Sequence, residues 1–325
     1  MRKTTPTPGT RHAPVRLPTD VDTVVLRDGE REVRLTHLRK VFWRGLGLTK
    51  RDLLQYYADV APVLLPHLAD RAMVMKRYPN GADQPFFFMK RVPNPHPPWL
   101  TLCPIEHESG SVIDFPVVQD VLSLLWIVNL GCIDLNQWYA RCDDVDRPDY
   151  VHFDLDPVTG TASVPFARLR EAAFIVRDGL AALDMPAFVK TTGSRGVHVY
   201  VPIVRGPTQK DVWTFSKRFA QALAAARPTL LTAEYRLSKR PPGRVLVDYN
   251  QNAWGRTLAS VYSVRPKPLA TVSMPVGWDE LETGVRISDY QLDNVPGLLQ
   301  QTGDCWKPLL GNTRFDLHAL DRSGV

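Results

Sequence analysis

The sequence predicts an α+β protein in which mixed or antiparallel central sheets are flanked by helices. Short apolar stretches of strand length recur along the chain, at 150–157, 197–203 and 244–250. Two longer stretches, 163–183 and 208–226, carry apolar residues at helical spacing. Strands and helices therefore follow one another in a mixed order, without the regular alternation that indicates a purely parallel sheet.

Length and composition are those of a globular protein with a basic excess. The chain has 325 residues, of which 44% are hydrophobic and 23% charged, and its formal net charge is +6. We expect residues 1–20, which are polar, basic and proline-rich, to form a flexible tail, and residues 21–325 to form a single domain. The positive charge is compatible with a polyanionic partner.

Two further observations concern the compartment in which the protein works. The longest apolar run, 121–128, is too short to cross a bilayer, and no signal-peptide segment follows the basic N-terminus. We therefore expect a cytoplasmic protein with no membrane partner. No CxxC pair occurs, and the scatter of the cysteines is typical of reduced thiols rather than of a zinc or redox motif. The cysteines are Cys103, Cys132, Cys142 and Cys305.

In the first half of the chain, periodicity and turn residues predict the elements. Residues 23–35 alternate apolar and charged side chains around a turn at Asp28-Gly29, which predicts a hairpin. Thr49 followed by Asp52 forms a helix capping pair, and the apolar stripe after it predicts a helix that ends at Pro62. The other predicted elements are strands at 71–79 and 85–91, a buried helix at 116–130, and a strand at 131–139 that contains Asp134.

The strands at 71–79 and 85–91 combine aromatic with basic side chains. Aromatic rings can stack on bases while Lys and Arg meet phosphates, so these strands are candidates for binding nucleic acid. An ordinary half-buried sheet, whose lysines extend their ammonium groups into solvent, explains the same pattern. On composition alone we favour the ordinary sheet.

The strand at 150–157, YVHFDLDP, ends in two carboxylates. Because alternate residues of a strand share a face, Asp154 and Asp156 point the same way, whereas Phe153 and Leu155 point to the other face. Two adjacent like charges are costly unless a cation neutralises them, and hard oxygen ligands suit Mg²⁺ or Mn²⁺. For such a pair on its own, a solvated strand end is the simpler explanation.

A third acid, Asp248, lies at the end of the strand predicted at 244–250. Two acids on one strand and one on another can hold two divalent ions, which clamp the attacking and leaving oxygens of a phosphoryl transfer. Taken alone, Asp248 would be a strand-end acid that bonds to the backbone.

Between a strand at 187–190 and the strand at 197–203 lies a tight polar turn, TTGSRG at 191–196. Gly193 and Gly196 allow backbone N–H groups to approach a ligand, and successive amides in such a turn form a nest for phosphate. The sequence is not a Walker A loop. Polar side chains accompany the turn: Thr192, Ser194, Arg195 and, on the next strand, His198. For His198, a structural role and a phosphate-binding role are equally supported.

Basic residues also surround Asp248 in the sequence. A solvated face is one explanation, and cations for the outer oxygens of a triphosphate are the other. The series comprises Lys239, Arg240, Arg244, Arg256, Arg265 and Lys267.

Three segments together are similar to the motifs of a known family. HFDLDP at 152–157, TTGSRGVHVYVPI at 191–203 and VLVDYNQN at 245–252 resemble, in order and spacing, motifs I, II and III of the archaeo-eukaryotic primase superfamily. The resemblance extends over roughly residues 30–310 and is greatest to the polymerase domain of bacterial ATP-dependent DNA ligase D and its stand-alone actinobacterial relatives. It implies a primase-polymerase fold, and the length of the chain suggests the stand-alone form.

The resemblance also implies roles for individual residues. Asp154, Asp156 and Asp248 match the family's metal ligands, so two Mn²⁺ or Mg²⁺ ions are the implied cofactors. The residues implied to bind the incoming nucleotide are Thr192, Ser194, Arg195, His198, Arg256 and Arg265.

A second group of residues matches the family's contacts to DNA. Lys40 and Lys50 resemble the lysine pair that recognises a 5′-phosphate on the downstream strand. Phe87 and Phe88 resemble the aromatic pair that stacks near the template. Lys76 and Lys90 flank that pair on the two basic strands.

Two positions depart from the family pattern. Asp134 lies where these domains commonly carry a histidine near the ribose 2′-hydroxyl, and His37 replaces an asparagine near the first lysine of the 5′-phosphate pair. We expect Asp134 to accept a hydrogen bond from the ribose, with a structural acid as the alternative.

The sequence therefore predicts a template-dependent polymerase that fills gaps or extends broken ends in DNA, with a preference for ribonucleotides. The expected partners are DNA, nucleoside triphosphates and, in a bacterial nucleoid, a ligase and end-binding repair proteins. Two alternatives remain: a metal-dependent nuclease or phosphoesterase that uses the same acids, and an inactive DNA-end-binding module.

Overall fold

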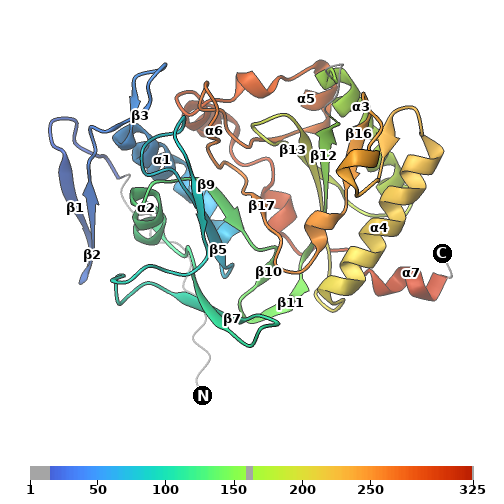
Figure 1. The fold of residues 1–325 in the computed structure, drawn as a ribbon, viewed down its shortest axis with the longest axis horizontal. Coiled ribbons are helices and arrows are strands. Elements are labelled where there is room, and N and C mark those ends of the chain that lie inside the picture. The colour runs from blue at the N-terminus through green and yellow to red at the C-terminus, as the bar shows by residue number, and fades with distance from the viewer. Residues whose placement is uncertain (1–14, 159–163, 324–325) are drawn as a thin grey trace.

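Two β-sheets form the centre of the protein, whose computed structural model describes residues 15–158 and 164–323. The larger sheet has six strands in the order β15-β16-β12-β14-β13-β18, and the smaller has four in the order β17-β9-β5-β6. All pairings in both sheets are antiparallel except that of β15 with β16, which is parallel. The α+β prediction with mixed or antiparallel sheets is confirmed (Figure 1).

The predicted strands are present, and most differ from the prediction by one to three residues at each end. The strands of the six-stranded sheet are β12 (Tyr150–Pro157), β13 (Phe188–Thr191), β14 (Val197–Pro202), β15 (Leu231–Thr232), β16 (Val245–Asp248) and β18 (Pro275–Val276). Those of the four-stranded sheet are β5 (Met73–Arg77), β6 (Phe87–Met89), β9 (Cys132–Gln137) and β17 (Leu258–Ala259).

Four two-stranded sheets surround this centre. The predicted N-terminal hairpin is confirmed, with Asp28 paired to Arg31 across the turn. The pairs are β1 (Thr23–Asp28) with β2 (Arg31–Thr36), β3 (Val41–Trp43) with β4 (Leu48–Thr49), β7 (Leu102–Glu106) with β8 (Val112–Pro116), and β10 (Ala140–Arg141) with β11 (Asp144–Pro148).

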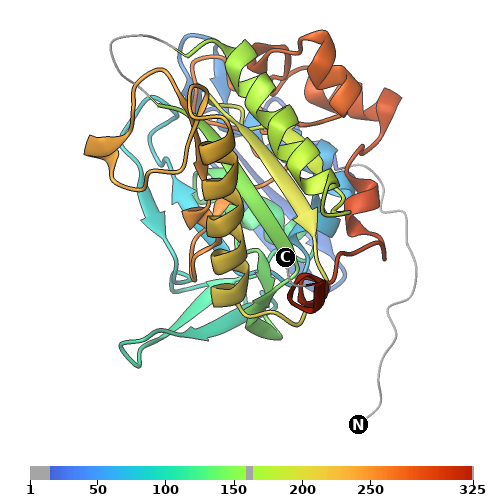
Figure 2. The ribbon, with the colours of Figure 1, turned by 90° about the vertical axis from the view of Figure 1, so that its right-hand side faces the viewer.

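Helices cover both sides of the molecule. In Figure 2, α3 and α4 lie in front of the strands of the six-stranded sheet, which they cover. On the other side, α1 and α2 pack on each other beside the N-terminal hairpin and the four-stranded sheet. The α-helices are α1 (Lys50–Leu68), α2 (Val121–Asn129), α3 (Phe166–Ala181), α4 (Gln209–Ala226), α5 (Trp278–Thr283), α6 (Val295–Thr302) and α7 (His318–Ser323). Short 3₁₀ helices are η1 (Leu237–Lys239), η2 (Asn250–Asn252), η3 (Ile287–Asp289) and η4 (Lys307–Leu310).

The bounds predicted for the two helices of the first half of the chain were wrong: α1 is longer than predicted, and α2 is shorter. Thr49 caps α1 as expected, but the helix continues through Pro62 to Leu68. Leu64 and Leu68 are fully buried, so packing outweighs the backbone hydrogen bond that proline removes. Conversely, α2 does not begin at residue 116, because β8 extends to Pro116 and Asp120 provides the N-cap.

The predicted N-terminal tail is only partly described. Residues 1–14 lie outside the described residues, whereas Leu17 is 4% exposed and its amide donates to Gln55 on α1. The packed part of the chain therefore begins before residue 21. No helix among residues 15–158 and 164–323 has the length and apolar character needed to cross a membrane.

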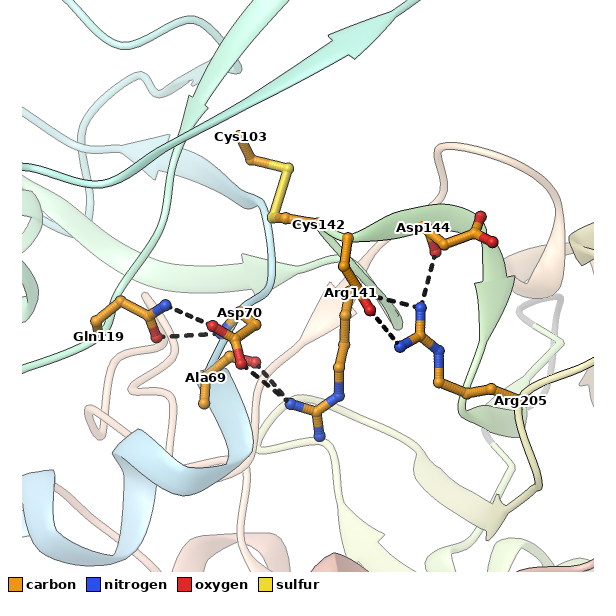
Figure 3. The surroundings of a disulfide bond; sticks show 9 residues. Ala69, Asp70, Cys103, Gln119, Arg141, Cys142, Asp144 and Arg205 are labelled. Atoms are coloured by element: carbon orange, nitrogen blue, oxygen red, sulfur yellow. Dashed lines mark hydrogen bonds and ion pairs between the residues drawn. A yellow bond between two sulfur atoms is a disulfide. The ribbon is translucent and has the colours of Figure 1, made fainter. Parts of the chain in front are cut away.

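The expectation that all cysteines are reduced is wrong. Cys103 and Cys142 form a disulfide between β7 and the turn after β10 (Figure 3). Cys132 is free and buried, and Cys305 is free and exposed. The spacing of 39 residues carries no motif, because packing of separate hairpins brings the two sulfurs together.

Candidate active site

The acidic pair lies at the end of β12, in the middle of the six-stranded sheet. Asp154 is 7% exposed and Asp156 is half-buried, while Phe153 and Leu155 are fully buried in the core on the other face, as the alternation predicts. In the sheet register, Asp154 stands opposite Asp248 on β16 and opposite His198 on β14. Antiparallel pairing thus brings together residues from all three predicted motifs.

The carboxylate of Asp248 is held by the segment that follows it. Its Oδ1 accepts the backbone N–H of Asn250 at 2.9 Å, and its Oδ2 accepts the Gln251 amide at 3.0 Å. Within residues 15–158 and 164–323, no three His, Cys, Asp or Glu side chains are placed closely enough to hold a metal ion.

Burial and mutual repulsion perturb the titration of the acidic pair. Burial, and then the charge of Asp248, raise the pKa of Asp154 to about 7. Burial, and then the charge of Asp154, raise the pKa of Asp156 to about 7. Such shifts arise where carboxylates are crowded away from water, and a divalent cation removes the repulsion between them.

His198 contacts the first acid directly. Its Nε2 lies 3.1 Å from Oδ1 of Asp154, and its ring is buried. Burial, together with the charges of Lys190 and Arg265, holds the pKa of His198 well below its usual range. The imidazole is therefore held neutral against this carboxylate, while Oδ1 of Asp154 accepts no hydrogen bond from the described residues.

The turn at 191–196 is organised around the hydroxyl of Thr192. Its oxygen accepts the backbone N–H groups of Ser194, Arg195 and Gly196 at 3.2, 3.3 and 3.0 Å. These are amides that we expected to be open to a phosphate. The turn instead presents the side chains of Ser194, which is half-buried, and Arg195, which is exposed.

Both glycines of this turn are required by close contacts. Gly193 has a φ of +64°, and a Cβ there would lie 2.7 Å from the backbone of Val272. A Cβ on Gly196 would lie 2.4 Å from the carbonyl oxygen of Leu155 and 3.0 Å from Asp156 Oδ1. The turn therefore packs directly on the strand that carries the acids.

Arg265 joins the turn to the four-stranded sheet. Its Nη1 donates to the carbonyl of Thr192, and its Nε lies 3.3 Å from Oδ2 of Asp134 on β9. The same Oδ2 lies 3.6 Å from Nζ of Lys76 on β5. The other oxygen of Asp134, Oδ1, is buried and has no hydrogen-bond partner among the described residues.

Exposed aromatic side chains on β6 flank the ion pairs of Asp134. Phe87 and Phe88 are 43% and 59% exposed, and the ammonium of Lys76 lies 5.7 Å from the centre of the Phe88 ring. The ring nearest to the Lys76 ammonium is that of Phe86, whose centre lies 4.2 Å away. Sequence reasoning missed Phe86, although it belongs to the same aromatic run. Lys90 is exposed just beyond the strand.

The predicted lysine pair is brought together by the β3–β4 hairpin. The amide of Lys50 donates to the carbonyl of Lys40 at 2.8 Å. Lys50 is buried with Nζ on the carbonyl of Thr36, and burial followed by the charge of Lys40 lowers the pKa of Lys50 to about 8. Lys40 is exposed and its Nζ bonds to Pro79 and Asn80, while His37 is exposed beside them.

Two further residues complete the placement of side chains around the site. Arg256 is exposed on the segment after η2. Lys190, which sequence reasoning missed, is fully buried on β13, where its Nζ donates to the carbonyl of Ala259 on β17 and to the hydroxyl of Ser273. A lysine ending the otherwise apolar strand AFVK, next to the polar turn, was the available signal.

Comparison with known proteins yields a consistent set of similarities. The model of the LigD primase-polymerase domain matches residues 49–306. The multifunctional non-homologous end joining DNA repair protein LigD of Mycobacterium tuberculosis is 36% identical over 301 residues, which cover 90% of this chain and 38% of that protein. The bifunctional non-homologous end joining protein LigD of Bacillus subtilis is 28% identical over 273 residues, covering 84% of this chain and 43% of that protein.

Among solved structures, the polymerase domain of Mycobacterium tuberculosis ligase D in complex with DNA matches with a TM-score of 0.80 and 33% identity. The match covers 86% of this chain and 99% of that domain. The chain thus spans less than half the length of the curated relatives and nearly all of one solved domain.

Proposed function

Since this chain belongs to the family of LigD primase-polymerase domains, we propose that it is a template-dependent nucleotidyltransferase acting at gaps or broken ends in DNA. The observation that carries the proposal is the convergence of the three motifs, with Asp154 opposite both Asp248 and His198. A primer 3′-hydroxyl would attack the α-phosphate of a nucleotide at this end of β12.

The acids fit a pair of Mg²⁺ or Mn²⁺ ions. Asp154, Asp156 and Asp248 would hold them, because burial and mutual repulsion raise the pKa values of the first two and a cation stabilises their charged forms. When bound, such ions lower the pKa of the attacking hydroxyl and neutralise the triphosphate and the departing pyrophosphate. We infer that the Asp248 carboxylate turns from Asn250 and Gln251 toward Asp154 when the site is loaded.

The cations beside the turn suit the nucleotide's triphosphate. Arg265 is held at two points, by Thr192 and Asp134, so its guanidinium is already oriented before a nucleotide arrives. Arg195, in the turn at 191–196, and Arg256, on the segment after η2, are exposed and would bind the outer phosphates. In this proposal Ser194 donates its hydroxyl, His198 keeps Asp154 oriented, and Thr192 shapes the turn.

Asp134 is our candidate for selecting ribonucleotides. Its Oδ2 is committed to Arg265 and Lys76, but its buried Oδ1 lacks a partner and can accept a hydrogen bond from a ribose 2′-hydroxyl. A site built for that bond discriminates against a sugar that lacks it. If Asp134 serves only its ion pairs, Asp134→Ala will change kcat/KM equally for ribo- and deoxyribonucleotides. We expect the ratio to fall instead.

Residues on the side of the four-stranded sheet, where Lys40 is exposed and Lys50 is buried, suit DNA. Lys40 and Lys50, with His37 beside them, would recognise a downstream 5′-phosphate, whose charge exceeds that of an internal diester. Phe87 and Phe88 would stack near the template, with Lys76 and Lys90 on the adjoining phosphates.

The names of the relatives indicate the biological setting. They are non-homologous end joining proteins, and we propose that this chain likewise fills gaps or extends ends during DNA repair, in the bacterial cytoplasm at the nucleoid. A ligase and end-binding repair proteins are the corresponding partners.

A metal-dependent nuclease is the second candidate, because the same three acids could activate water. The pre-oriented Arg265 favours the polymerase, since hydrolysis of a diester has no triphosphate to bind. Extension of a gapped duplex, with ribo- and deoxyribonucleotides under each metal, separates the candidates. The polymerase lengthens the primer by one nucleotide per template position, a nuclease shortens the DNA, and a binding module leaves it unchanged.

A further inference from the structure

We propose that Cys103 and Cys142 form a reversible redox site, through which a dithiol reductant controls the mobility of the β7–β8 hairpin. Only the DNA-binding consequence of this inference rests on the proposed function. The pair is disulfide-bonded, with a Cα–Cα distance of 5.7 Å that lies in the ordinary range for such bonds. It links two hairpins that belong to different two-stranded sheets.

The two sulfurs differ in accessibility. Cys103 is 1% exposed and packs in an apolar cluster with Ile105, Phe115 and Trp138, whereas Cys142 is half-buried in the turn between β10 and β11. Figure 3 shows Cys142 at this turn, with Arg141 and Arg205 on the same side of the bond. Cys142 also packs against this cluster but is the more exposed residue of the two, so we assign the attack of an incoming thiolate to its sulfur.

Reduction of the disulfide proceeds by thiol–disulfide exchange and needs no group from the active site. A thiolate of the dithiol attacks Sγ of Cys142, and Cys103 leaves as a thiolate that takes up a proton. The second thiol of the reagent then attacks the mixed disulfide, which releases the Cys142 thiol and a cyclic disulfide. The bond forms again when a hydroperoxide, itself reduced to an alcohol, oxidises one thiol to a sulfenic acid that condenses with the other thiol and releases water. Oxidised glutathione gives the same product by two exchange steps that release two molecules of glutathione.

The turn that carries Cys142 is fixed to the body of the protein. The amide of Cys142 donates to the carbonyl of Asp70 at 2.7 Å, and Arg141 pairs with Asp149 at 3.0 Å. Arg205 holds the next residue, Asp143, through two bonds of 2.8 and 2.9 Å. This side of the disulfide therefore acts as a rigid anchor.

The β7–β8 hairpin on the other side is held by an apolar cluster and by single hydrogen bonds to neighbouring segments. It is a two-stranded sheet of its own, and an isolated hairpin is marginally stable. Beyond its apolar cluster, an isolated bridge from Ala72 to Val117 ties the end of the hairpin to the chain. Breaking the disulfide removes the covalent restraint and leaves the hairpin more mobile.

The hairpin in turn supports two segments of the proposed site, one that we place on DNA and one that we place on the nucleotide. Residues just after β6, the strand of Phe87 and Phe88, bond to β8: Val92 donates to Asp114, and Arg91 to Val112, both at 2.8 Å. His107, next to β7, lies edge-on to Trp254 at 5.3 Å, two residues before Arg256. A mobile hairpin would therefore loosen both segments.

The test uses the full-length protein and compares dithiothreitol with oxidised glutathione. Denaturation and alkylation with N-ethylmaleimide should label two cysteines, Cys132 and Cys305, in the oxidised protein and all four after reduction. We expect reduction to speed hydrogen exchange at 102–116, to lower Tm by on the order of 5 °C, and to weaken binding of a gapped duplex roughly three- to tenfold.

Two variants serve as controls. Cys103→Ser/Cys142→Ser should behave as the reduced protein in both buffers, and Cys305→Ser should respond as the wild type does. Four labelled cysteines in oxidised glutathione would overturn the proposal, as would hairpin exchange or DNA affinity that is the same in both buffers. If no buffer supports DNA binding, the proposed function fails, while the alkylation and exchange data still decide the redox site.

Discussion

The candidate site has two walls that differ in construction: a buried wall on the six-stranded sheet and an exposed wall on the side of the four-stranded sheet. On the six-stranded sheet, Asp154 and His198 are buried on paired central strands, and Asp248 is held by two hydrogen bonds. On the four-stranded side, Phe87 and Phe88 are exposed on the edge strand β6, and Lys40 lies at the surface.

This difference matches the demands of the two tasks. Transfer of a nucleotidyl group tolerates little displacement of the reacting atoms, so the groups that perform it are best fixed in advance. A DNA surface must accept many sequences and end structures, and exposed aromatic and basic side chains adapt to them. The comparison predicts that substitutions in the buried wall abolish chemistry, whereas those in the exposed wall change binding.

The largest effect should come from Asp154→Asn, which keeps the size of the side chain but removes its charge. We expect single-turnover nucleotide addition to fall at least about a hundredfold, because a ligand to the metal is lost. The affinity for gapped DNA should stay within about threefold of wild type, since electrostatic contacts elsewhere dominate it. Asp178→Asn, at an exposed acid on α3, is the matched control. A variant that kept a tenth of the wild-type rate would show that Asp154 is no metal ligand.

Arg265→Gln should act on the nucleotide rather than on the DNA. Loss of a charge-assisted contact to phosphate should raise KM for the nucleotide roughly tenfold or more, with little change in Kd for DNA. Arg286→Gln, at an exposed arginine far along the chain, provides the comparison. An unchanged KM together with a weaker Kd would move Arg265 to the DNA surface.

The lysine pair, of which Lys40 is exposed and Lys50 is buried, tests the comparison on the side of the four-stranded sheet. Wild type should bind a gapped duplex with a 5′-phosphate about tenfold more tightly than one with a 5′-hydroxyl, and Lys40→Ala/Lys50→Ala should lose the difference. The contrast should shrink as salt rises, because the contact is electrostatic. Lys210→Ala, at an exposed lysine of α4, should keep the preference. Equal affinity of the wild type for both ends would remove the proposed phosphate site.

The smallest effect concerns pH. Burial raises the pKa values of Asp154 and Asp156 from 3.8 to about 7, so the metal-free folded protein retains protons that the unfolded chain releases. The stability that they contribute is complete below about pH 4 and is lost as pH rises through about 7. Tm without metal should therefore fall by a few degrees, roughly, between pH 5.5 and 8. The slope should be flatter in Asp154→Asn/Asp156→Asn.

Addition of Mn²⁺ gives the complementary result. Because the ion competes with protons for these carboxylates, it should raise Tm more at pH 8 than at pH 6. A rise that is independent of pH would place the ion on other ligands.

Much of this site could be predicted from local sequence. The alternation of HFDLDP places both acids on one face. The capped start of α1 and the N-terminal hairpin were equally predictable, because capping and turn chemistry act over a few residues. The register of β12 with β14 and β16 had no local signal, since these strands have 8, 6 and 4 residues.

The errors arose where distant segments meet. Nothing near Cys103 in the sequence points to Cys142, and the continuation of α1 past Pro62 depends on the core that covers it. The ion pairs of Asp134 with Arg265 and Lys76, and the burial of Lys190 between the two sheets, likewise depend on tertiary packing. Such contacts have no local signal.

The central claim is that the acids at the end of β12 and β16 perform nucleotidyl transfer on DNA bound by the other wall. The most direct measurement is incorporation of one nucleotide into a one-nucleotide gap by wild type and Asp248→Asn, with Kd for the same duplex measured in parallel. The account predicts one added nucleotide for the wild type, none for the variant and similar Kd values for both. Equal incorporation by the two proteins, or loss of DNA binding alone, would contradict it.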